Sequence, residues 1–259
     1  MELVYRPVIG IALGIFKVLS WDVRLSGTEH IPKSGPAVIA TNHVGYLDFV
    51  FVGYAARASG RLVRFLAKQE VFDHKISGPL MRGMKHIPVD RFGRAKDSVE
   101  TSVAALERGE IIGMFPESTI NPSFVPGQGR SGAARMAMAA GAPLLPGAVW
   151  GSQRIMTKGR PRNFQRKVAI TVDLGSPVAY DPGEDAAEVT ARLMQEISGL
   201  VKKAADAYPQ SPAADQDRWW LPAHLGGTAP TPEEAAARLA AEREARRKRR
   251  ERLDEAGSD

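Results

Sequence analysis

The sequence predicts an α/β fold in which a mostly parallel or mixed central sheet is flanked by helices. Short apolar runs rich in β-branched residues alternate with segments whose apolar residues recur every three or four positions, and this alternation is typical of such sheets. The chain has 259 residues, 44% of them hydrophobic, so it can bury one full core. We expect a main domain at residues 22–208, an apolar segment at 1–21, and at 209–259 a linker, a tryptophan pair and a charged tail.

The composition excludes several classes of chemistry. The chain contains no cysteine, so it has no disulfide, no cysteine nucleophile, and no zinc or iron–sulfur site built on cysteine. Its net charge of +6 suits a nucleic acid, an anionic membrane surface or a phosphorylated substrate equally well. The choice among these partners therefore depends on the motifs.

Residues 7–21 form an apolar stretch whose one charged residue is Lys17. It is shorter than the about 20 residues that a membrane-spanning helix needs, and it lacks the cationic start and cleavage site of a secretory signal. Apolar residues on nearly every face predict a helix in the membrane interface, with Arg6, Lys17 and Trp21 as headgroup anchors. The alternative is a first core helix that packs on the sheet.

The remaining elements follow from residue patterns along the chain. Residues 21–27 alternate in polarity and predict an edge strand, whereas residues 36–41 are apolar and predict a buried strand. Further strands are expected at 61–68, 86–90, 111–115, 143–150 and 166–173, and helices at 49–58, 76–84, 95–108, 131–141, 187–208 and 232–255. The last of these helices is charged and solvated, and its run of cations at 246–250 suits either anionic lipid or a soluble tail.

A histidine and an aspartate follow the buried strand at 36–41. His43 lies where this strand ends, and ligands bind at the carboxyl ends of strands in open α/β sheets. A straight helix would point His43 and Asp48 in different directions, so a bend is required, and Gly45 permits one. If the turn closes, Asp48 accepts the proton of one imidazole nitrogen and leaves the other as a base, without an attached nucleophile. The alternative is a chance spacing, with Asp48 capping a helix.

Four blocks of the sequence resemble, in order, the motifs of the glycerolipid acyltransferase superfamily, most closely the 1-acylglycerol-3-phosphate acyltransferases. His43 and Asp48 match the N-H-x4-D block, and residues 83–91 match the second block. Residues 115–119 match the F-P-E-G-T-R block, and residues 144–148 are similar to the fourth, proline-containing strand. The resemblance covers about residues 20–180 and implies a glycerol-3-phosphate acyltransferase-like fold with an N-terminal interfacial helix.

The resemblance also implies a role for each matching residue. His43 would act as general base on a glycerol hydroxyl, Asp48 would orient and charge the imidazole, and the hydroxyl would attack an acyl thioester directly. Arg91 and Glu117 would seat the glycerol phosphate, because a guanidinium pairs well with phosphate oxygens. The alternatives are a surface ion pair with Asp90 for Arg91, and a helix cap or a structural hydrogen bond for Glu117.

Two positions depart from the family pattern and concern the acceptor site. Ser118 stands where the family usually has glycine, which indicates a backbone that need not adopt a glycine-only conformation. Ile120 replaces the usual arginine and removes a cation from the expected phosphate site. Arg130 lies near a position where relatives often carry lysine, and it is expected to restore this charge at a helix N-terminus. Together with Ser118 and Thr119 it completes the expected substrate-binding residues.

The resemblance therefore implies an enzyme that moves a fatty acyl group from acyl-CoA or acyl-carrier protein to lysophosphatidate, forming phosphatidate in phospholipid biosynthesis. It implies a peripheral or monotopic protein at the cytoplasmic face of the cell membrane, with no metal and no bound cofactor. One alternative is the same chemistry on another lysophospholipid or on glycerol phosphate. A second is a catalytically inactive, membrane-associated lipid-binding protein, which the presence of His43 and Asp48 disfavours. We expect no nucleic-acid partner, because no recognised binding motif is present.

Overall fold

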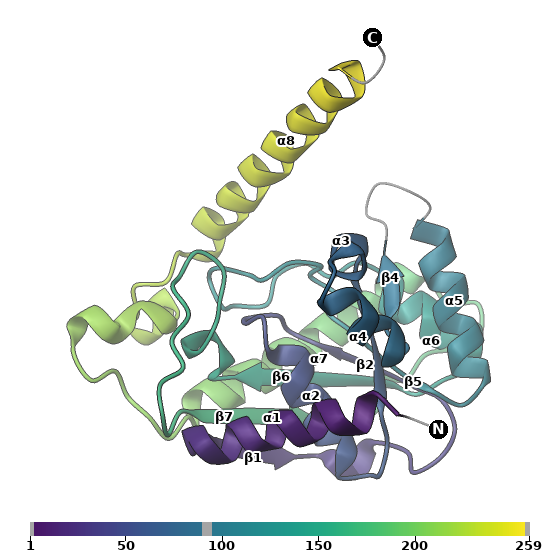
Figure 1. Cartoon of the computed structure of the whole chain (residues 1–259), viewed down its shortest axis with the longest axis horizontal. Coiled ribbons are helices and arrows are strands. Elements are labelled where there is room, and N and C mark those ends of the chain that lie inside the picture. Colours follow the sequence, from purple (N-terminus) through teal and green to yellow (C-terminus); the bar gives the residue numbers. More distant parts are fainter. Residues whose placement is uncertain (1–2, 90–94, 257–259) are drawn as a thin grey trace. The chain divides into compact units, whose positions relative to one another are not determined.

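The computed structural model describes residues 3–89 and 95–256, and the chain divides into two compact units (Figure 1). The first unit comprises Met1–Ile120 with Pro126–Ser211, and the second comprises Asn121–Val125 with Pro212–Asp259. The strands are β1 (Asp22–Ser26), β2 (Ala37–Thr41), β3 (Val63–Lys68), β4 (Ile87–Val89), β5 (Ile111–Met114), β6 (Leu144–Trp150) and β7 (Ala169–Leu174). The α-helices are α1 (Tyr5–Leu19), α2 (Asp48–Arg57), α3 (Gln69–Asp73), α4 (Ser77–Gly83), α5 (Ala95–Glu107), α6 (Gly132–Ala140), α7 (Ala186–Asp206) and α8 (Pro232–Ala256). Only α8 lies in the second unit.

The seven strands form one mixed sheet in the order β1-β7-β6-β2-β5-β3-β4. Neighbouring strands are parallel except for β6 and β7, so β1 and β7 run opposite to the other strands. The predicted fold class is confirmed. Strand β2 lies in the middle, with every residue buried, and Val38 pairs with Ile112 of β5 and Leu144 of β6. The end of β2 therefore opens at the centre of the carboxyl edge of the sheet, where ligands bind in α/β folds.

Most elements agree with the sequence prediction to within a few residues. The edge position of β1 and the burial of β2 are confirmed. Helix α3 was not predicted, because its five residues are too few to show a helical period.

Helices cover both faces of the sheet. Helices α1 and α2 share one layer, in which the ring of Phe16 stacks on that of Phe51 with centroids 5.3 Å apart. Helix α6 contacts both α5 and α7, and all three helices also contact strands of the sheet. Burying a large apolar side chain contributes about 1.5–3 kcal/mol, so both layers stabilise the sheet that carries the end of β2.

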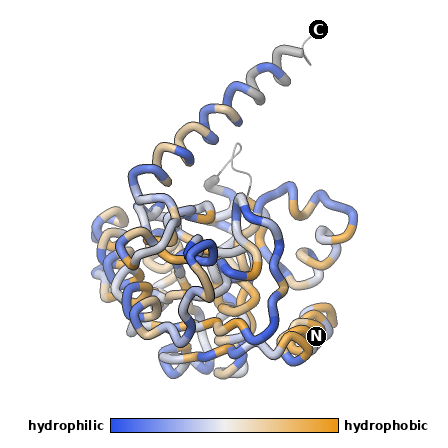
Figure 2. The backbone as a smooth tube through the Cα atoms, turned by 90° about the vertical axis from the view of Figure 1, so that its left-hand side faces the viewer, coloured by the Kyte–Doolittle hydropathy of each residue, from blue (hydrophilic) through white to orange (hydrophobic). Residues whose placement is uncertain are grey.

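Helix α1 has one face in the core and one face exposed. Tyr5 and Phe16 are buried, whereas Ile11 and Val18 are 66% and 65% exposed and Ile15 is 44% exposed. Residues three or four apart share a helix face, so these exposed side chains form a continuous apolar surface, which we call the outer face of α1. The N-terminal helix is coloured hydrophobic around most of its circumference (Figure 2). One face of α1 therefore packs in the core, as the alternative interpretation predicts. The outer face is not covered by the described part of the chain and could contact a membrane.

The position of Trp21 corrects one expectation. Its side chain is only 8% exposed, and its indole N–H donates a hydrogen bond of 2.9 Å to the carbonyl oxygen of Gln165. A headgroup anchor must reach the membrane interface, so Trp21 does not serve as one; its ring packs against Phe16 and Phe51 instead. No helix in the described part of the chain is both long enough and apolar enough to cross a bilayer.

Candidate active site

The turn at residues 42–47 joins the end of β2 to the start of α2, and Asn42 fixes its beginning. The Asn42 side-chain amide donates to the Val149 carbonyl at 3.0 Å, and its oxygen accepts from the Val149 N–H at 2.8 Å. These two bonds continue the pairing of β2 with β6 one residue beyond the last backbone pair, which involves Thr41. The next residue, His43, therefore leaves the sheet from a fixed point.

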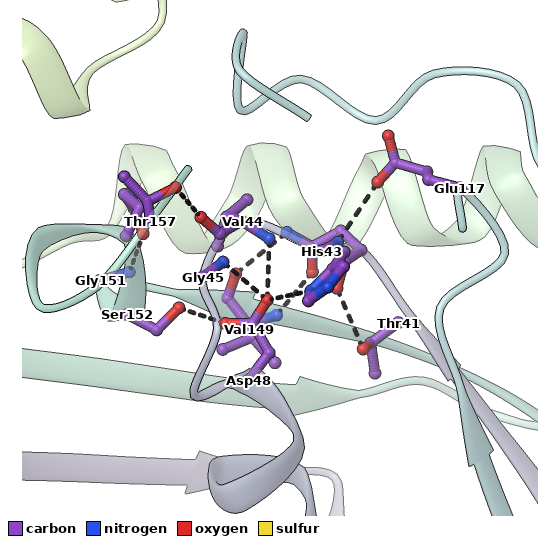
Figure 3. Close-up of polar contacts among 12 residues, drawn as sticks. Thr41, His43, Val44, Gly45, Asp48, Glu117, Val149, Gly151, Ser152 and Thr157 are labelled. Atoms are coloured by element: carbon purple, nitrogen blue, oxygen red, sulfur yellow. Dashed lines mark hydrogen bonds and ion pairs between the residues drawn. The ribbon is translucent and has the colours of Figure 1, made fainter. Parts of the chain in front are cut away.

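The bend expected between His43 and Asp48 is present, and it brings their side chains together (Figure 3). The imidazole Nδ1 lies 2.9 Å from Asp48 Oδ2. Because a carboxylate only accepts hydrogen bonds, Nδ1 carries the proton and Nε2 holds the free lone pair. Nε2 bonds to no residue in the described part of the chain, and the His43 side chain is 19% exposed. This ring can therefore take a proton from a molecule that enters the site.

Asp48 is fully buried, and both oxygens of its carboxylate accept hydrogen bonds. Oδ2 also accepts the backbone N–H groups of Val44 and Gly45 at 2.8 and 2.9 Å, and Oδ1 accepts the hydroxyl of Ser152. Charge-assisted hydrogen bonds of this kind are about twice as strong as neutral ones. The surroundings thus suit a carboxylate anion that orients the imidazole and balances the charge it acquires.

Gly45 is required for a different reason from the one expected. The sequence predicts a bend that uses the conformational freedom of glycine, but Gly45 does not have a positive φ angle. A Cβ atom at this position would lie 2.9 Å from the Ser152 hydroxyl, closer than Cβ contacts come in proteins, and 3.1 Å from the Met156 carbonyl oxygen, tighter than most such contacts. The missing side chain therefore lets residues 152–157 approach the turn, where the Thr157 hydroxyl bonds the Val44 carbonyl at 2.6 Å.

The residues after β5 hold His43 from the other side. The imidazole stacks on the ring of Phe115, with centroids 4.1 Å apart and planes 14° apart. The backbone N–H of His43 donates to Glu117 Oε1 at 3.3 Å, and the N–H of Gly127 donates to Oε2 at 3.1 Å. These contacts correspond to the structural alternative for Glu117. Its contribution to seating the glycerol phosphate stays a prediction.

Ser118 corrects a second expectation. Its φ angle is +60°, which is in the left-handed region that favours glycine, so the expectation of an ordinary backbone here is wrong. The Ser118 N–H closes a turn onto the Phe115 carbonyl at 2.9 Å, and this turn sets the conformation at a cost of about 1–2 kcal/mol for a residue with a side chain. The neighbouring Thr119 is half-buried and Ile120 is buried.

Two arginines, Arg91 and Arg130, are the cations expected at the acceptor phosphate, and the structure describes only Arg130. Arg91 lies outside the described residues. Arg130 is exposed, and its backbone N–H donates to the Pro116 carbonyl at 3.0 Å, which places its backbone beside the block at 115–119. Both roles remain predictions. Within residues 3–89 and 95–256, no group of three or more His, Asp or Glu side chains is arranged to hold a metal ion.

Sequence reasoning missed Ser152 and Thr157, which support the turn from the segment after β6. Ser152 is fully buried and lies 104 positions from Asp48, so no local pattern connects them. The predicted fold nevertheless places Ser152 near this turn. It closely follows the fourth motif strand, and the ends of parallel strands at one sheet edge lie close together.

Residues 22–150 match the family model described as Acyltransferase. A 1-acyl-sn-glycerol-3-phosphate acyltransferase from Bacillus subtilis (strain 168) is 30% identical over 198 residues, which cover 74% of this chain and 94% of the relative. The chloroplastic 1-acyl-sn-glycerol-3-phosphate acyltransferase LPAT1 of Arabidopsis thaliana is 28% identical, over 54% of this chain and 39% of its own length. The crystal structure of the 1-acyl-sn-glycerophosphate acyltransferase PlsC from Thermotoga maritima shares the fold, with a TM-score of 0.60 at 21% identity, covering 75% of this chain and 77% of that chain.

Proposed function

The chain belongs to the 1-acyl-sn-glycerol-3-phosphate acyltransferase family, and we propose that it transfers a fatty acyl group from a thioester to the free hydroxyl of lysophosphatidate. The product is phosphatidate, so the reaction belongs to phospholipid biosynthesis. The observation that carries this proposal is the pairing of His43 Nδ1 with Asp48 at 2.9 Å, which leaves Nε2 available as a base.

The proposed reaction is a direct transfer. His43 Nε2 removes the proton from the acceptor hydroxyl as its oxygen attacks the thioester carbonyl, and Asp48 stabilises the imidazolium that forms. The tetrahedral intermediate collapses with cleavage of the carbon–sulfur bond, and the imidazolium returns the proton to the leaving thiolate. One ester is formed and one thiol is released. His43 and Asp48 are regenerated without a net change.

No serine or threonine hydroxyl in the described part of the chain is hydrogen-bonded to His43 Nε2 as an activated nucleophile would be. The chain has no cysteine, and the Ser152 hydroxyl is buried and donates to Asp48. Attack by the acceptor itself therefore fits the site better than an acyl-enzyme intermediate. Substrate seating by Arg91, Glu117, Ser118, Thr119 and Arg130 remains part of the proposal.

We further propose that residues 22–208 form the catalytic domain and that α1 holds it at the membrane. A long-chain acceptor and its product reside in a bilayer, so the site must reach one, and the outer face of α1 supplies exposed apolar side chains for interfacial binding. This proposal places the protein, peripheral or monotopic, at the cytoplasmic face of the cell membrane. The donor is either acyl-CoA or acyl-carrier protein, without a further cofactor.

A thiol-release assay on the full chain tests the proposed function. Acyl-CoA and acyl-carrier protein are each combined with lysophosphatidate, glycerol 3-phosphate or a lysophospholipid without a free phosphate. We expect thiol release with lysophosphatidate in clear excess over the other acceptors. Preference for another acceptor would support the alternative substrate within the superfamily. Vesicle binding without thiol release from any combination would support the inactive lipid-binding protein.

A further inference from the structure

The loop at residues 158–167, which we call the basic loop, joins β6 to β7 and carries cations without carboxylates. Its cations are Lys158, Arg160, Arg162, Arg166 and Lys167. Residues 159–167 are all exposed, and Phe164 is 50% exposed. In α8, by contrast, arginines alternate with glutamates and pair with them, as in Arg247 with Glu244 at 2.9 Å. The charge of the basic loop is therefore not offset within its own segment.

The basic loop is attached to the C-terminal end of α1. The Lys167 N–H donates to the Leu19 carbonyl at 2.9 Å, and Arg166 Nη2 donates to the Ser20 hydroxyl at 3.2 Å. Val18, which belongs to the outer face of α1, directly precedes this attachment point. In Figure 1 the green loop after β6 descends to this end of α1. Exposed cations and exposed apolar side chains are thus neighbours on one unit of the protein.

The same chain segment also reaches the candidate active site. Residues immediately before the basic loop bond the turn that contains His43: the Met156 carbonyl accepts from the Tyr46 N–H at 2.8 Å, and the Thr157 hydroxyl bonds the Val44 carbonyl. The Asn163 N–H donates to the Ile155 carbonyl at 2.7 Å, which folds the loop back on this support. Whatever the loop binds is therefore held close to the catalytic turn.

We propose that the basic loop binds an anionic phospholipid surface, with its arginines on the headgroup phosphates and Phe164 in the interface. This inference rests on the membrane contact proposed for α1 and adds a second, electrostatic element to it. A bilayer is the partner that meets both kinds of side chain, because its headgroups attract cations while its interface accepts apolar and aromatic groups. Contacts through both α1 and the basic loop fix the orientation of the protein on the bilayer. With α1 alone, the protein could still rotate about the axis of this helix.

Vesicle sedimentation of the full chain tests this proposal. The vesicles are phosphatidylcholine with about one third phosphatidylglycerol, in about 0.1 M salt, and pure phosphatidylcholine serves for comparison. Arg160→Gln/Arg162→Gln is compared with Arg108→Gln/Arg135→Gln, which removes the same charge from exposed positions after α5 and on α6. Phe164→Ser tests the aromatic contact. The assay contains no donor and no acceptor, so its result does not depend on the proposed reaction.

We expect the loop double variant to bind the anionic vesicles about 25-fold more weakly and the control variant to change by less than about twofold. Phe164→Ser should weaken binding to both kinds of vesicle by about tenfold. In molar salt the loop double variant and the wild type should bind equally. Equal losses in loop and control variants would show a general effect of charge and overturn the proposal. Binding of the loop double variant at the wild-type level would also overturn the proposal. Acyl-carrier protein would then be the next candidate for the partner of the basic loop.

Discussion

The hydroxyl of Ser152 donates a hydrogen bond to Asp48 Oδ1 although the two residues are 104 positions apart. The other oxygen, Oδ2, bonds His43 Nδ1. Because both oxygens are bound, the carboxylate plane is fixed, and the direction in which it holds the imidazole is fixed with it. Ser152 is therefore a positioning residue for the His43–Asp48 pair.

Ser152→Ala should lower kcat by about 10–100-fold, because a hydrogen bond to a charged group contributes about 1.5–3 kcal/mol. The KM for the acceptor should change little, since Ser152 is buried behind Asp48. Ser152→Thr retains the hydroxyl and should recover most of the lost kcat. Steady-state kinetics and circular dichroism measure these effects. Equal kcat in the alanine variant and the wild type would contradict the positioning role. An alanine variant that merely unfolds would assign Ser152 a structural role.

His43→Ala should reduce acyl transfer by about 10²–10⁴-fold, the usual contribution of a positioned general base. Asp48→Asn should also be severely impaired, because an amide cannot balance the charge of the imidazolium. Thiol release measures both, with circular dichroism to show that each variant is folded. Near wild-type turnover in either folded variant would contradict the His–Asp mechanism.

Arg130→Ala should chiefly raise the KM for lysophosphatidate, because an arginine on a phosphate mainly contributes ground-state binding. Arg135→Ala on α6 is the matched control, since this exposed arginine should leave the KM unchanged. Arg91→Ala should have the same effect as Arg130→Ala if both cations contact the phosphate. An unchanged KM in the Arg130 variant, together with a raised KM in the Arg91 variant, would assign the phosphate to Arg91 alone.

Burial, and secondarily the charge of Arg64, lower the pKa of His86 from about 6.5 to about 4. The unfolded chain therefore binds a proton between these pH values while the folded chain does not, so stability should fall as the pH decreases through this window. The loss from this residue approaches about 3 kcal/mol at the acidic end. Nδ1 of His86 accepts the Phe65 N–H at 3.0 Å, a bond that an asparagine oxygen can replace.

His86→Asn should consequently lose this part of the pH dependence. Urea unfolding at pH values near 6.5 and 4.5 measures it, and the difference between wild type and variant removes the contribution of carboxylates common to both. An identical slope in the two proteins would contradict the assignment to His86.

Ile11→Gln/Val18→Gln should release the protein from vesicles in molar salt, where electrostatic attraction is screened. Full insertion of each side chain contributes about 1.5–3 kcal/mol, so binding should weaken by about 100-fold. This variant is a better test than deletion of residues 1–20, which would also remove Tyr5 and Phe16 from the core. Ala139→Gln on α6 is the control, and unchanged sedimentation of the Ile11/Val18 variant would place the anchor elsewhere.

The sequence predicted those parts of the fold and site that depend on local patterns. The run at residues 36–41 predicted the buried strand β2, and the short spacing of His43 and Asp48 predicted a pair that one turn could close. The features that the sequence did not predict depend on contacts between residues that are distant in sequence. The need for Gly45 arises from residues 152–157, and the buried Trp21 packs on Phe51 and bonds the Gln165 carbonyl. Neither partner can be inferred from residues near Gly45 or Trp21.

The pairing of β1 with β7 also determines when the N-terminus can fold. Asp22 pairs with Ala169, so during synthesis the first strand has no partner until most of the chain has left the ribosome. Contacts of such high sequence separation form late. The apolar α1 therefore emerges before residues 165–167, which bond its C-terminal end, and a bilayer bound as proposed would compete for it with the rest of the nascent protein.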